Sequence, residues 1–281
     1  MKHHIQETIK NSLRMAGIGI IRYESLQGLR EELQGLREEL RTLRAEKFRN
    51  ERASDDLAFL KALDKSVVDK AIRLLEKSQS QLRQDIFVLS ELGFKRDGFF
   101  VEFGATNGID LSNTYLLEKE FSWRGILAEP ARIWHENLIE NRSANVDFEC
   151  VWRESGQTLN FKEVSIAELS TISELNTKDM HSEARKKGNT YPVNTISLLD
   201  LLKKYDAPKR IDYLSIDTEG SEYAILKDFN FNEYNISVIT CEHNYTNDRK
   251  NIYDLLTANG YDRKYEELSR FDDWYVRQQT R

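Results

Sequence analysis

Acidic side chains stand where several apolar runs of the sequence end. Glu102 and Glu129 close two such runs, and Asp217 closes a third. A further run ends in Glu242 and His243. If these runs are parallel strands, their carboxyl ends lie along one edge of a sheet, where ligands of open α/β sheets bind. The residues predict a site that can hydrogen-bond a polar ligand and accept a proton.

The first of these strand ends carries a glycine-containing loop. Its sequence, V-E-F-G-A-T-N-G (101–108), lacks the G-x-G-x-x-G spacing of a dinucleotide-binding loop. Glu102 would repel a pyrophosphate at the following helix N-terminus, but it would attract the ammonium of a methionine moiety. On the next strand, Glu129 could accept both hydroxyls of a ribose. The alternative is that Glu102 is an ordinary edge charge and that Glu129 favours a helix dipole.

Strands and helices alternate through the second part of the chain. Strands are expected at 99–104, 124–130, 145–151, 211–217 and 236–241, and helices at 113–121, 197–205, 221–229 and 251–259. Aromatic segments near Tyr261 and Trp274 predict a closing β-hairpin. The alternation predicts a doubly wound, mostly parallel α/β sheet covered on both faces. All three prolines fall between expected elements, and the polar stretch from Ser165 to Asn194 is expected to be a lid or binding loop.

The N-terminal part contains leucines at alternating spacings of three and four. They are Leu26, Leu29, Leu33, Leu36, Leu40 and Leu43. Arginines and glutamates at the flanking heptad positions favour a coiled coil that makes the protein a homo-oligomer. A single amphipathic helix lying on the chain's own globular domain is the alternative. Three parts are expected: a helix with coiled-coil heptads (1–53), a helical lead-in (54–95) and an α/β domain (96–281).

Four motifs together resemble one enzyme family. They are VEFGATNG (101–108), SNTY (112–115), the Glu-Pro pair at 129–130 and DTEGSE (217–222). This combination is similar to the FkbM-type S-adenosylmethionine-dependent methyltransferases, and the similarity runs from about Gln84 to Val276. It implies a seven-stranded Rossmann-like sheet of the class I methyltransferase fold. One glycine of the usual family loop is replaced by Thr106 here, which restricts the backbone conformations that the turn can adopt.

The resemblance also implies where S-adenosylmethionine binds. Its methionine end would lie among residues of the first loop, Glu102, Gly104, Ala105, Asn107 and Gly108. Asn113 would help to bind the cofactor's carboxylate, and Glu129 would hold the ribose. Cys150 and Val151 would frame the adenine, and Asp217 would lie beside the cofactor.

The resemblance implies O-methylation, frequently of a sugar hydroxyl on a glycan or glycoconjugate. A general base would assist such a weak nucleophile, typically by about 10²–10⁴-fold. His243 is favoured because its usual pKa lies near neutrality, and the other candidates are Asp217, Glu219 and Glu242. A histidine that serves only as a structural post is the alternative. Asp217, Glu242 and His243 could instead hold a divalent cation.

The amino-acid composition limits which partners and which cellular compartment are expected for the protein. Acidic residues outnumber basic ones by 47 to 41, which argues against nucleic acid as a partner. Two cysteines without a CxxC spacing favour a reduced, cytoplasmic protein without a disulfide framework. No apolar run is long enough to span a membrane. Two other functions stay open: methylation of a small non-sugar hydroxyl or amine, and a coiled-coil scaffold whose methyltransferase-like domain is not catalytic.

Overall fold

The computed structural model describes residues 32–33, 52–164, 170–172 and 188–278. The chain divides into two compact units, Met1–Asp55 and Asp56–Arg281. Apart from Leu33, the leucines of the predicted coiled coil lie outside the described residues. The fold and the site described below belong to the second unit.

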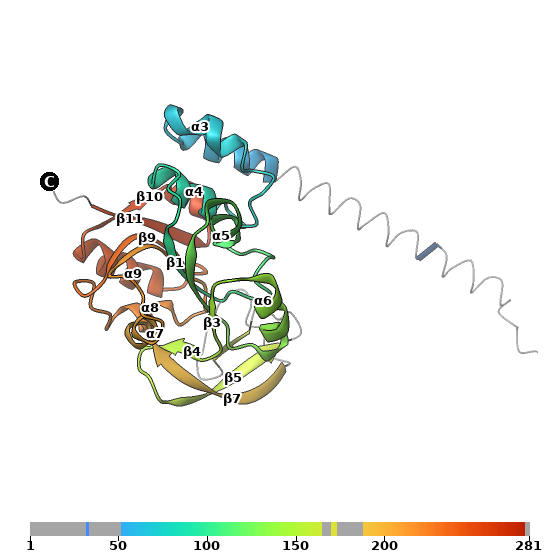
Figure 1. Ribbon diagram of the computed structural model, residues 1–281, viewed down its shortest axis with the longest axis vertical. Coiled ribbons are helices and arrows are strands. Elements are labelled where there is room, and N and C mark those ends of the chain that lie inside the picture. The colour runs from blue at the N-terminus through green and yellow to red at the C-terminus, as the bar shows by residue number, and fades with distance from the viewer. Residues whose placement is uncertain (1–31, 34–51, 165–169, 173–187, 279–281) are drawn as a thin grey trace, which may run out of the picture. The chain divides into compact units, whose positions relative to one another are not determined.

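A mixed sheet of seven strands forms the centre of this unit. Its strands are β1 (Phe99–Phe103), β2 (Arg124–Ala128), β3 (Asn145–Asp147), β8 (Arg210–Ile216), β9 (Asn235–Glu242), β10 (Tyr261–Lys264) and β11 (Asp272–Arg277). They follow the order β3-β2-β1-β8-β9-β11-β10 (Figure 1). The first five strands are parallel, whereas β11 pairs antiparallel with both β9 and β10. The predicted α/β sheet and its C-terminal hairpin are thus confirmed. The sheet is mixed, because β11 runs antiparallel to its neighbours.

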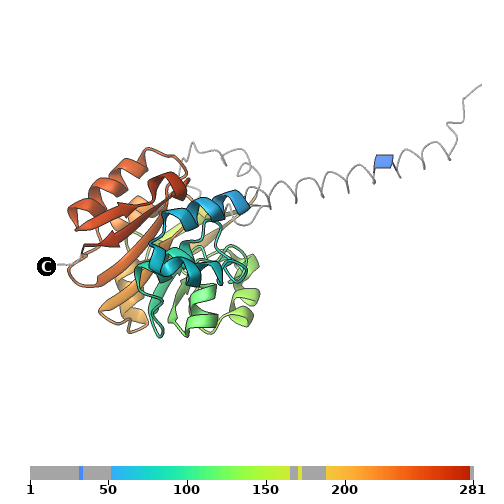
Figure 2. The same cartoon turned by 90° about the horizontal axis from the view of Figure 1, so that it is seen from above.

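Helices cover both faces of this sheet (Figures 1 and 2). Those described are α3 (Lys65–Ile72), α4 (Gln84–Glu91), α5 (Tyr115–Phe121), α6 (His135–Asn141), α7 (Leu198–Lys204), α8 (Glu222–Leu226), α9 (Asp248–Ala258), α10 (Glu266–Ser269) and the 3₁₀ turn η1 (Arg132–Trp134). Successive strand residues point to opposite faces. In β1, Val101 packs in the core with α7, α8 and α9, whereas Phe100 packs with α4 and α5. β1 is therefore apolar on both sides, which explains the continuous hydrophobic run at this strand in the sequence.

A second, four-stranded sheet was not expected from the sequence. Its strands are β4 (Cys150–Trp152), β5 (Thr158–Val164), β6 (Thr171–Ile172) and β7 (Gly188–Ser197), in the order β4-β7-β5-β6. The single strand expected at 145–151 is wrong, because the chain breaks at Phe148 and its two halves join different sheets. The stretch from Ser165 to Asn194 was expected to be a loop. Among its described residues, 171–172 form β6 and 188–194 belong to β7, so the expectation is wrong for these residues.

Pro192 is the one proline that lies inside an element. It stands in β7 opposite Asn160 of β5, and on the other side β7 pairs with β4 only from Thr195 onward. Its missing N–H therefore falls where no strand requires a donor, which is the position in which sheets tolerate proline.

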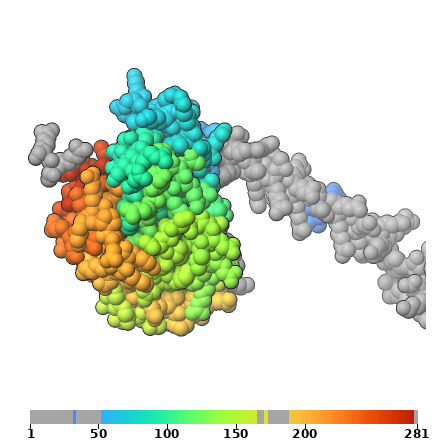
Figure 3. All heavy atoms as spheres, viewed as in Figure 1, coloured from blue at the N-terminus to red at the C-terminus, as the bar shows by residue number. Residues whose placement is uncertain are grey.

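The helical lead-in packs against the central sheet. Residues 52–62 are helical, and Phe59 meets the ring of Trp274 edge to face at 6.1 Å. Phe87 of α4 stacks on the same indole at 4.7 Å. The buried Arg83 pairs with Asp56 at 2.7 Å. The space-filling view shows this cyan segment directly against the green residues of the α/β core (Figure 3). No helix among the described residues is long and apolar enough to cross a membrane.

Candidate functional site

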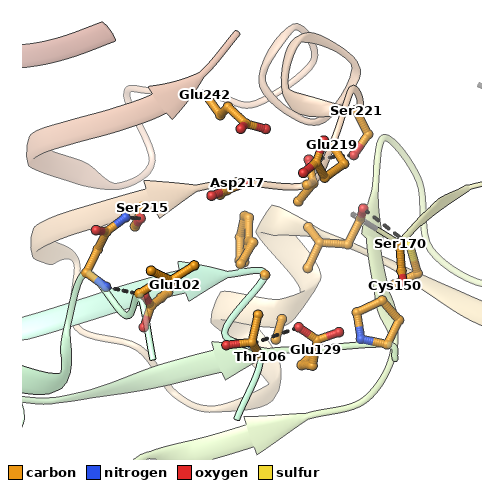
Figure 4. A pocket seen from close by; sticks show the side chains of 18 of the residues that line it. Glu102, Thr106, Glu129, Cys150, Ser170, Ser215, Asp217, Glu219, Ser221 and Glu242 are labelled. Carbon is orange, nitrogen blue, oxygen red and sulfur yellow. Dashed lines mark hydrogen bonds between the residues drawn. The ribbon is translucent and has the colours of Figure 1, made fainter. Parts of the chain in front are cut away.

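A cavity of about 330 Å³ opens at the carboxyl ends of β1, β2, β8 and β9. One end is lined by Glu129 and Cys150, and the other by Asp217, Glu219 and Glu242 (Figure 4). Cavities of this size and position are typical of small-molecule sites in α/β proteins. The structure therefore brings most of the predicted side chains into one cavity.

The loop after β1 is shaped by a close approach of two strand ends. Gly104 has φ +75°, and a Cβ there would lie 2.0 Å from the carbonyl oxygen of Asp217. Only glycine fits this position without moving the end of β8. Thr106, in place of a glycine of the usual family loop, adopts φ +47°. The turn therefore keeps a left-handed residue at this position despite the substitution.

Glu129 is bound to this loop and remains able to bind a ligand. It is only 4% exposed, and its two carboxylate oxygens accept the N–H groups of Thr106 at 2.9 Å and Ala131 at 2.8 Å. Loss of water on burial raises its pKa to about 7, against the effect of these two hydrogen bonds. Each oxygen keeps a second lone pair, so the carboxylate can still accept two ligand hydroxyls.

Glu102 lines the cavity but already has many donors. Its carboxylate accepts the backbone N–H of Asn113 at 2.7 Å and the hydroxyls of Ser112 and Thr114. The guanidinium of Arg142 lies 3.7 Å away. This carboxylate therefore fixes the SNTY segment in place. Arg142 was not expected from the sequence, because nothing in its local pattern connects α6 with a strand end.

Asn113 offers a hydrogen-bond acceptor to the cavity. Its Nδ2 donates to Ser215 Oγ at 3.0 Å, while its buried Oδ1 has no partner. An unpartnered acceptor suits a donor group such as an ammonium. The structure thus places an unpartnered acceptor at this wall of the cavity, and the role of Asn113 in binding the cofactor's carboxylate stays a prediction.

Three carboxylates form a cluster at the other end of the cavity. Oxygen atoms of Asp217, Glu219 and Glu242 all lie within 4.8 Å of one another. Burial, together with neighbouring negative charges, raises the pKa of Asp217 to about 6 and that of Glu242 well above its usual value. Such neighbours do not readily ionise together, and the side chains of Glu242 and Asp217 are hydrogen-bonded to each other. We call these three residues the acidic cluster.

His243 lies outside the described lining of the cavity. Its ring is buried, with Nδ1 accepting the N–H of Tyr245 at 3.0 Å and Nε2 lying 3.7 Å from Asp273. Burial lowers the pKa of this imidazole. The structure does not bring His243 together with the acidic cluster, and its contacts are those of a residue that holds the chain after β9.

The other predicted residues divide into two groups. Val151 lines the cavity beside Cys150, whose burial raises the pKa of its thiol to about 12. Ala105, Asn107 and Gly108 are absent from the described lining. Asn107 instead closes its own loop, because its Oδ1 accepts the N–H groups of the two residues 109–110.

Several lining residues were not expected from the sequence. Phe161, Ser170 and Ile172 come from the second sheet, and Asn244 and Phe271 lie near the acidic cluster. The first three fall in or beside a segment that polarity alone assigned to a loop. β6 has only two residues, and in β5 the alternation of apolar and polar residues breaks after Phe161, so neither segment indicates a strand clearly.

Comparison with known proteins identifies the family. The model of the Methyltransferase FkbM domain matches residues 102–265, more than half of the chain. The chain belongs to the FkbM methyltransferase family. A structure of a fibrillarin/Nop5p complex aligns with 71% of this chain and 81% of its own, at 12% identity and a TM-score of 0.34, which is too slight a likeness to carry an argument. No curated protein matches this FkbM methyltransferase. Family membership implies S-adenosylmethionine as the methyl donor.

Proposed function

We propose that this FkbM methyltransferase transfers a methyl group from S-adenosylmethionine to a sugar hydroxyl of a glycan or glycoconjugate. The observation that carries the proposal is the kind of polar side chain that lies at each end of the cavity. A buried carboxylate suited to ribose lies at one end, and a cluster of acids suited to hydroxyl groups lies at the other. The two ends match a nucleoside and an acceptor.

The residues present fit the cofactor's groups. Glu129 would accept the ribose hydroxyls, and Asn113 Oδ1, buried and without a partner, would accept the ammonium. The apolar side chains of Val151, Phe161 and Ile172 would flank the adenine. When bound, S-adenosylmethionine supplies an electrophilic methyl group.

The acidic cluster would activate the acceptor. Asp217, with a pKa of about 6, is ionised at neutral pH and can take the proton of an acceptor hydroxyl. The acceptor oxygen would then be the nucleophile for the methyl group that bound S-adenosylmethionine supplies, with the cofactor's sulfur leaving as a thioether. Glu242 in its neutral form stabilises the Asp217 carboxylate, and Glu219 can accept a hydrogen bond from a second acceptor hydroxyl. In this proposal the base is a carboxylate, and the imidazole of His243 takes no part.

The lining favours a neutral, hydroxyl-rich acceptor. Six acidic side chains and no basic one line the cavity among the described residues. A phosphate or carboxylate on the acceptor would be repelled near the acidic cluster, whereas sugar hydroxyls donate to carboxylates. The lining therefore favours a neutral sugar over an acidic small molecule as the substrate.

The acidic cluster also fits a divalent cation. Three carboxylates supply oxygen ligands of the kind that Mg²⁺ prefers, and Glu242 Oε2 is buried without a hydrogen-bond partner. The donor set would then be Asp217, Glu219 and Glu242, with His243 excluded by its position. A bound cation would lower the pKa of an acceptor hydroxyl. A protein base would then not have to remove the hydroxyl's proton unaided.

A transfer assay separates these alternatives. The full-length protein is incubated with methyl-labelled S-adenosylmethionine and a panel of neutral sugars, acidic sugars, amines and phenols, with and without a chelator. Labelled sugar ethers support the proposal, and label only on amines or phenols overturns it. Loss of transfer with the chelator, restored by magnesium or manganese, favours the cation. Binding of the donor without transfer to any acceptor favours a non-catalytic scaffold.

The heptads from Leu26 to Leu43 support a separate proposal about assembly. We propose that they join copies of the chain into an oligomer. Light scattering of the full-length protein and of a chain that lacks residues 1–50 tests it. An oligomer in the first and a monomer in the second are expected, and a monomeric full-length protein overturns the proposal.

A further inference from the structure

Glu219 holds an unusual backbone conformation within the DTEGSE turn. It has φ +60°, a left-handed value that residues with a Cβ rarely adopt, and Gly220 follows with φ +115°. Such a conformation persists only where surrounding contacts enforce it, and it occurs most often at functional sites. The contacts around Glu219 therefore show what fixes the third member of the acidic cluster.

The turn is fastened from within by Glu222. One carboxylate oxygen of Glu222 accepts the N–H groups of Thr218 and Gly220, each at 3.0 Å, and the Thr218 hydroxyl at the same distance. These bonds close the loop at the start of α8. They leave the carbonyl and the carboxylate of Glu219 to be fixed by other parts of the chain.

Two polar side chains from distant segments reach Glu219. Asn244, after β9, donates from Nδ2 to Glu219 Oε2 at 3.2 Å. Thr171, in β6, donates from Oγ1 to the Glu219 carbonyl at 3.0 Å. Both donors are buried, with exposures of 8% and 4%. One contact therefore aims the carboxylate, and the other holds the strained backbone.

Thr171 belongs to the wall of the cavity. Its neighbours on either side, Ser170 and Ile172, both line the cavity, and Ile172 belongs to the same apolar cluster as Cys150 and Phe161. β6 is paired to β5, with Thr171 opposite Lys162. The hydroxyl of Thr171 thus joins the apolar wall that contains Ile172 and Cys150 to the turn that carries Glu219.

We propose that Thr171 and Asn244 are positioning residues that hold the Glu219 carboxylate against Asp217 and Glu242. The proposal rests on the proposed function for its catalytic consequence. Neither residue is expected to touch the acceptor's reacting atoms. Their effect on methyl transfer passes through Glu219.

Thr171→Val tests the first contact with little change in shape, because it replaces the hydroxyl by a methyl group. We expect kcat to fall at least tenfold, while the Kd for S-adenosylmethionine changes less than threefold. Thr171→Ser restores the donor and should return kcat to within threefold of the original. Thr257→Val is the matched control, since the Thr257 hydroxyl donates to a carbonyl of its own helix at the surface.

A double-mutant cycle distinguishes positioning from general stabilisation. In a Glu219→Ala background, the carbonyl remains but the carboxylate is gone. Thr171→Val or Asn244→Ala should then lower kcat by less than twofold further. A full tenfold loss in that background would overturn the proposal, because the two residues would then act independently of the Glu219 carboxylate.

A crystal structure of Thr171→Val decides the proposal without any acceptor. We expect the Glu219 carboxylate to leave the group of oxygens that lie within 4.8 Å of one another. An unmoved carboxylate would overturn the positioning role even if the enzyme methylates sugars. If no sugar is methylated by the unmodified enzyme, the proposed function fails, and the crystal structure still decides whether Thr171 positions Glu219.

Discussion

The backbone N–H of Thr106 donates a hydrogen bond of 2.9 Å to the carboxylate of Glu129, which follows β2. This bond ties the two strand ends that would flank a nucleoside. It also leaves Glu129 buried beside other acids, so that its pKa of about 7 lies well above that of an ordinary glutamate. If Glu129 binds the ribose as we propose, the properties of this carboxylate will affect cofactor binding directly.

Glu129→Ala should weaken binding of S-adenosylmethionine at least tenfold. The loss corresponds to about 1.4 kcal/mol or more, because two ribose hydroxyls lose their acceptor. Titration calorimetry measures it. Glu136→Ala, on the exposed start of α6, is the control and should leave the affinity unchanged. Unchanged affinity in Glu129→Ala would contradict the placement of the ribose.

The affinity for S-adenosylmethionine should rise with pH. Below a pH of about 7 the free protein carries a proton on Glu129, and a ribose bound by the carboxylate form must displace it. The Kd should therefore fall between pH 6 and pH 8 and level off above this range. Glu129→Gln should remove this dependence. A Kd that is flat across pH 6–8 in the unmodified protein would show that the neutral acid binds equally well.

Asp217→Asn should make the protein more stable and inactive. The folded protein raises the pKa of Asp217 from 3.8 to about 6, so it binds a proton that the unfolded chain releases. The stability is then fullest below pH 4 and falls as pH rises through 6. For this half-buried group, the amide should add about 1 kcal/mol, or about 2–4 °C in Tm, at pH 8 and much less at pH 4. A lower Tm at pH 8 would contradict it.

Replacement of His243 should affect the chemistry little. His243→Asn can still accept the Tyr245 N–H, and the imidazole is not part of the described cavity lining, where an acceptor hydroxyl would lie. We expect kcat within about tenfold of the original, well short of the 10²–10⁴-fold loss of a general base. A larger loss in a variant with normal Tm and cofactor affinity would restore His243 as the base.

Arg142→Ala should destabilise the fold strongly. The side chain is fully buried between Glu118, at 2.9 Å, and Glu102, and both buried carboxylates would lose this counter-charge, with Lys119 at 3.2 Å left beside Glu118. Breaking such a pair costs about 3–5 kcal/mol in the free energy of unfolding. Urea denaturation measures it. Arg153→Ala removes an exposed pair with Glu154 and should cost less than about 1 kcal/mol. Equal effects of the two would contradict the structural role of Arg142.

The sequence predicted the strand ends well because their signals are local. Glu102, Glu129 and Asp217 stand at or near the ends of short apolar runs typical of buried strands, and parallel strands bring such ends to one edge. The second sheet has no such signal. It depends on the pairing of Cys150 with Thr195, which are far apart in the sequence, and β6 has only two residues.

The expectation for His243 neglected a signal that the sequence does contain. Neighbouring residues of an extended chain point in opposite directions, so Glu242 and His243 could not both face the cavity. Glu242 lines it, and the imidazole packs on the other side. Asn244 and Thr171 could not be found in this way, because their contacts with Glu219 join separate loops. The coiled coil stays a prediction.

Transfer of a labelled methyl group to a sugar tests the central claim most directly. The full-length protein is incubated with labelled S-adenosylmethionine and neutral glycans, and the product is analysed by mass spectrometry and NMR. The account predicts a label on a sugar oxygen as a methyl ether, lost in Asp217→Asn. Label on nitrogen or on no sugar, in a protein that binds the cofactor tightly, would contradict it.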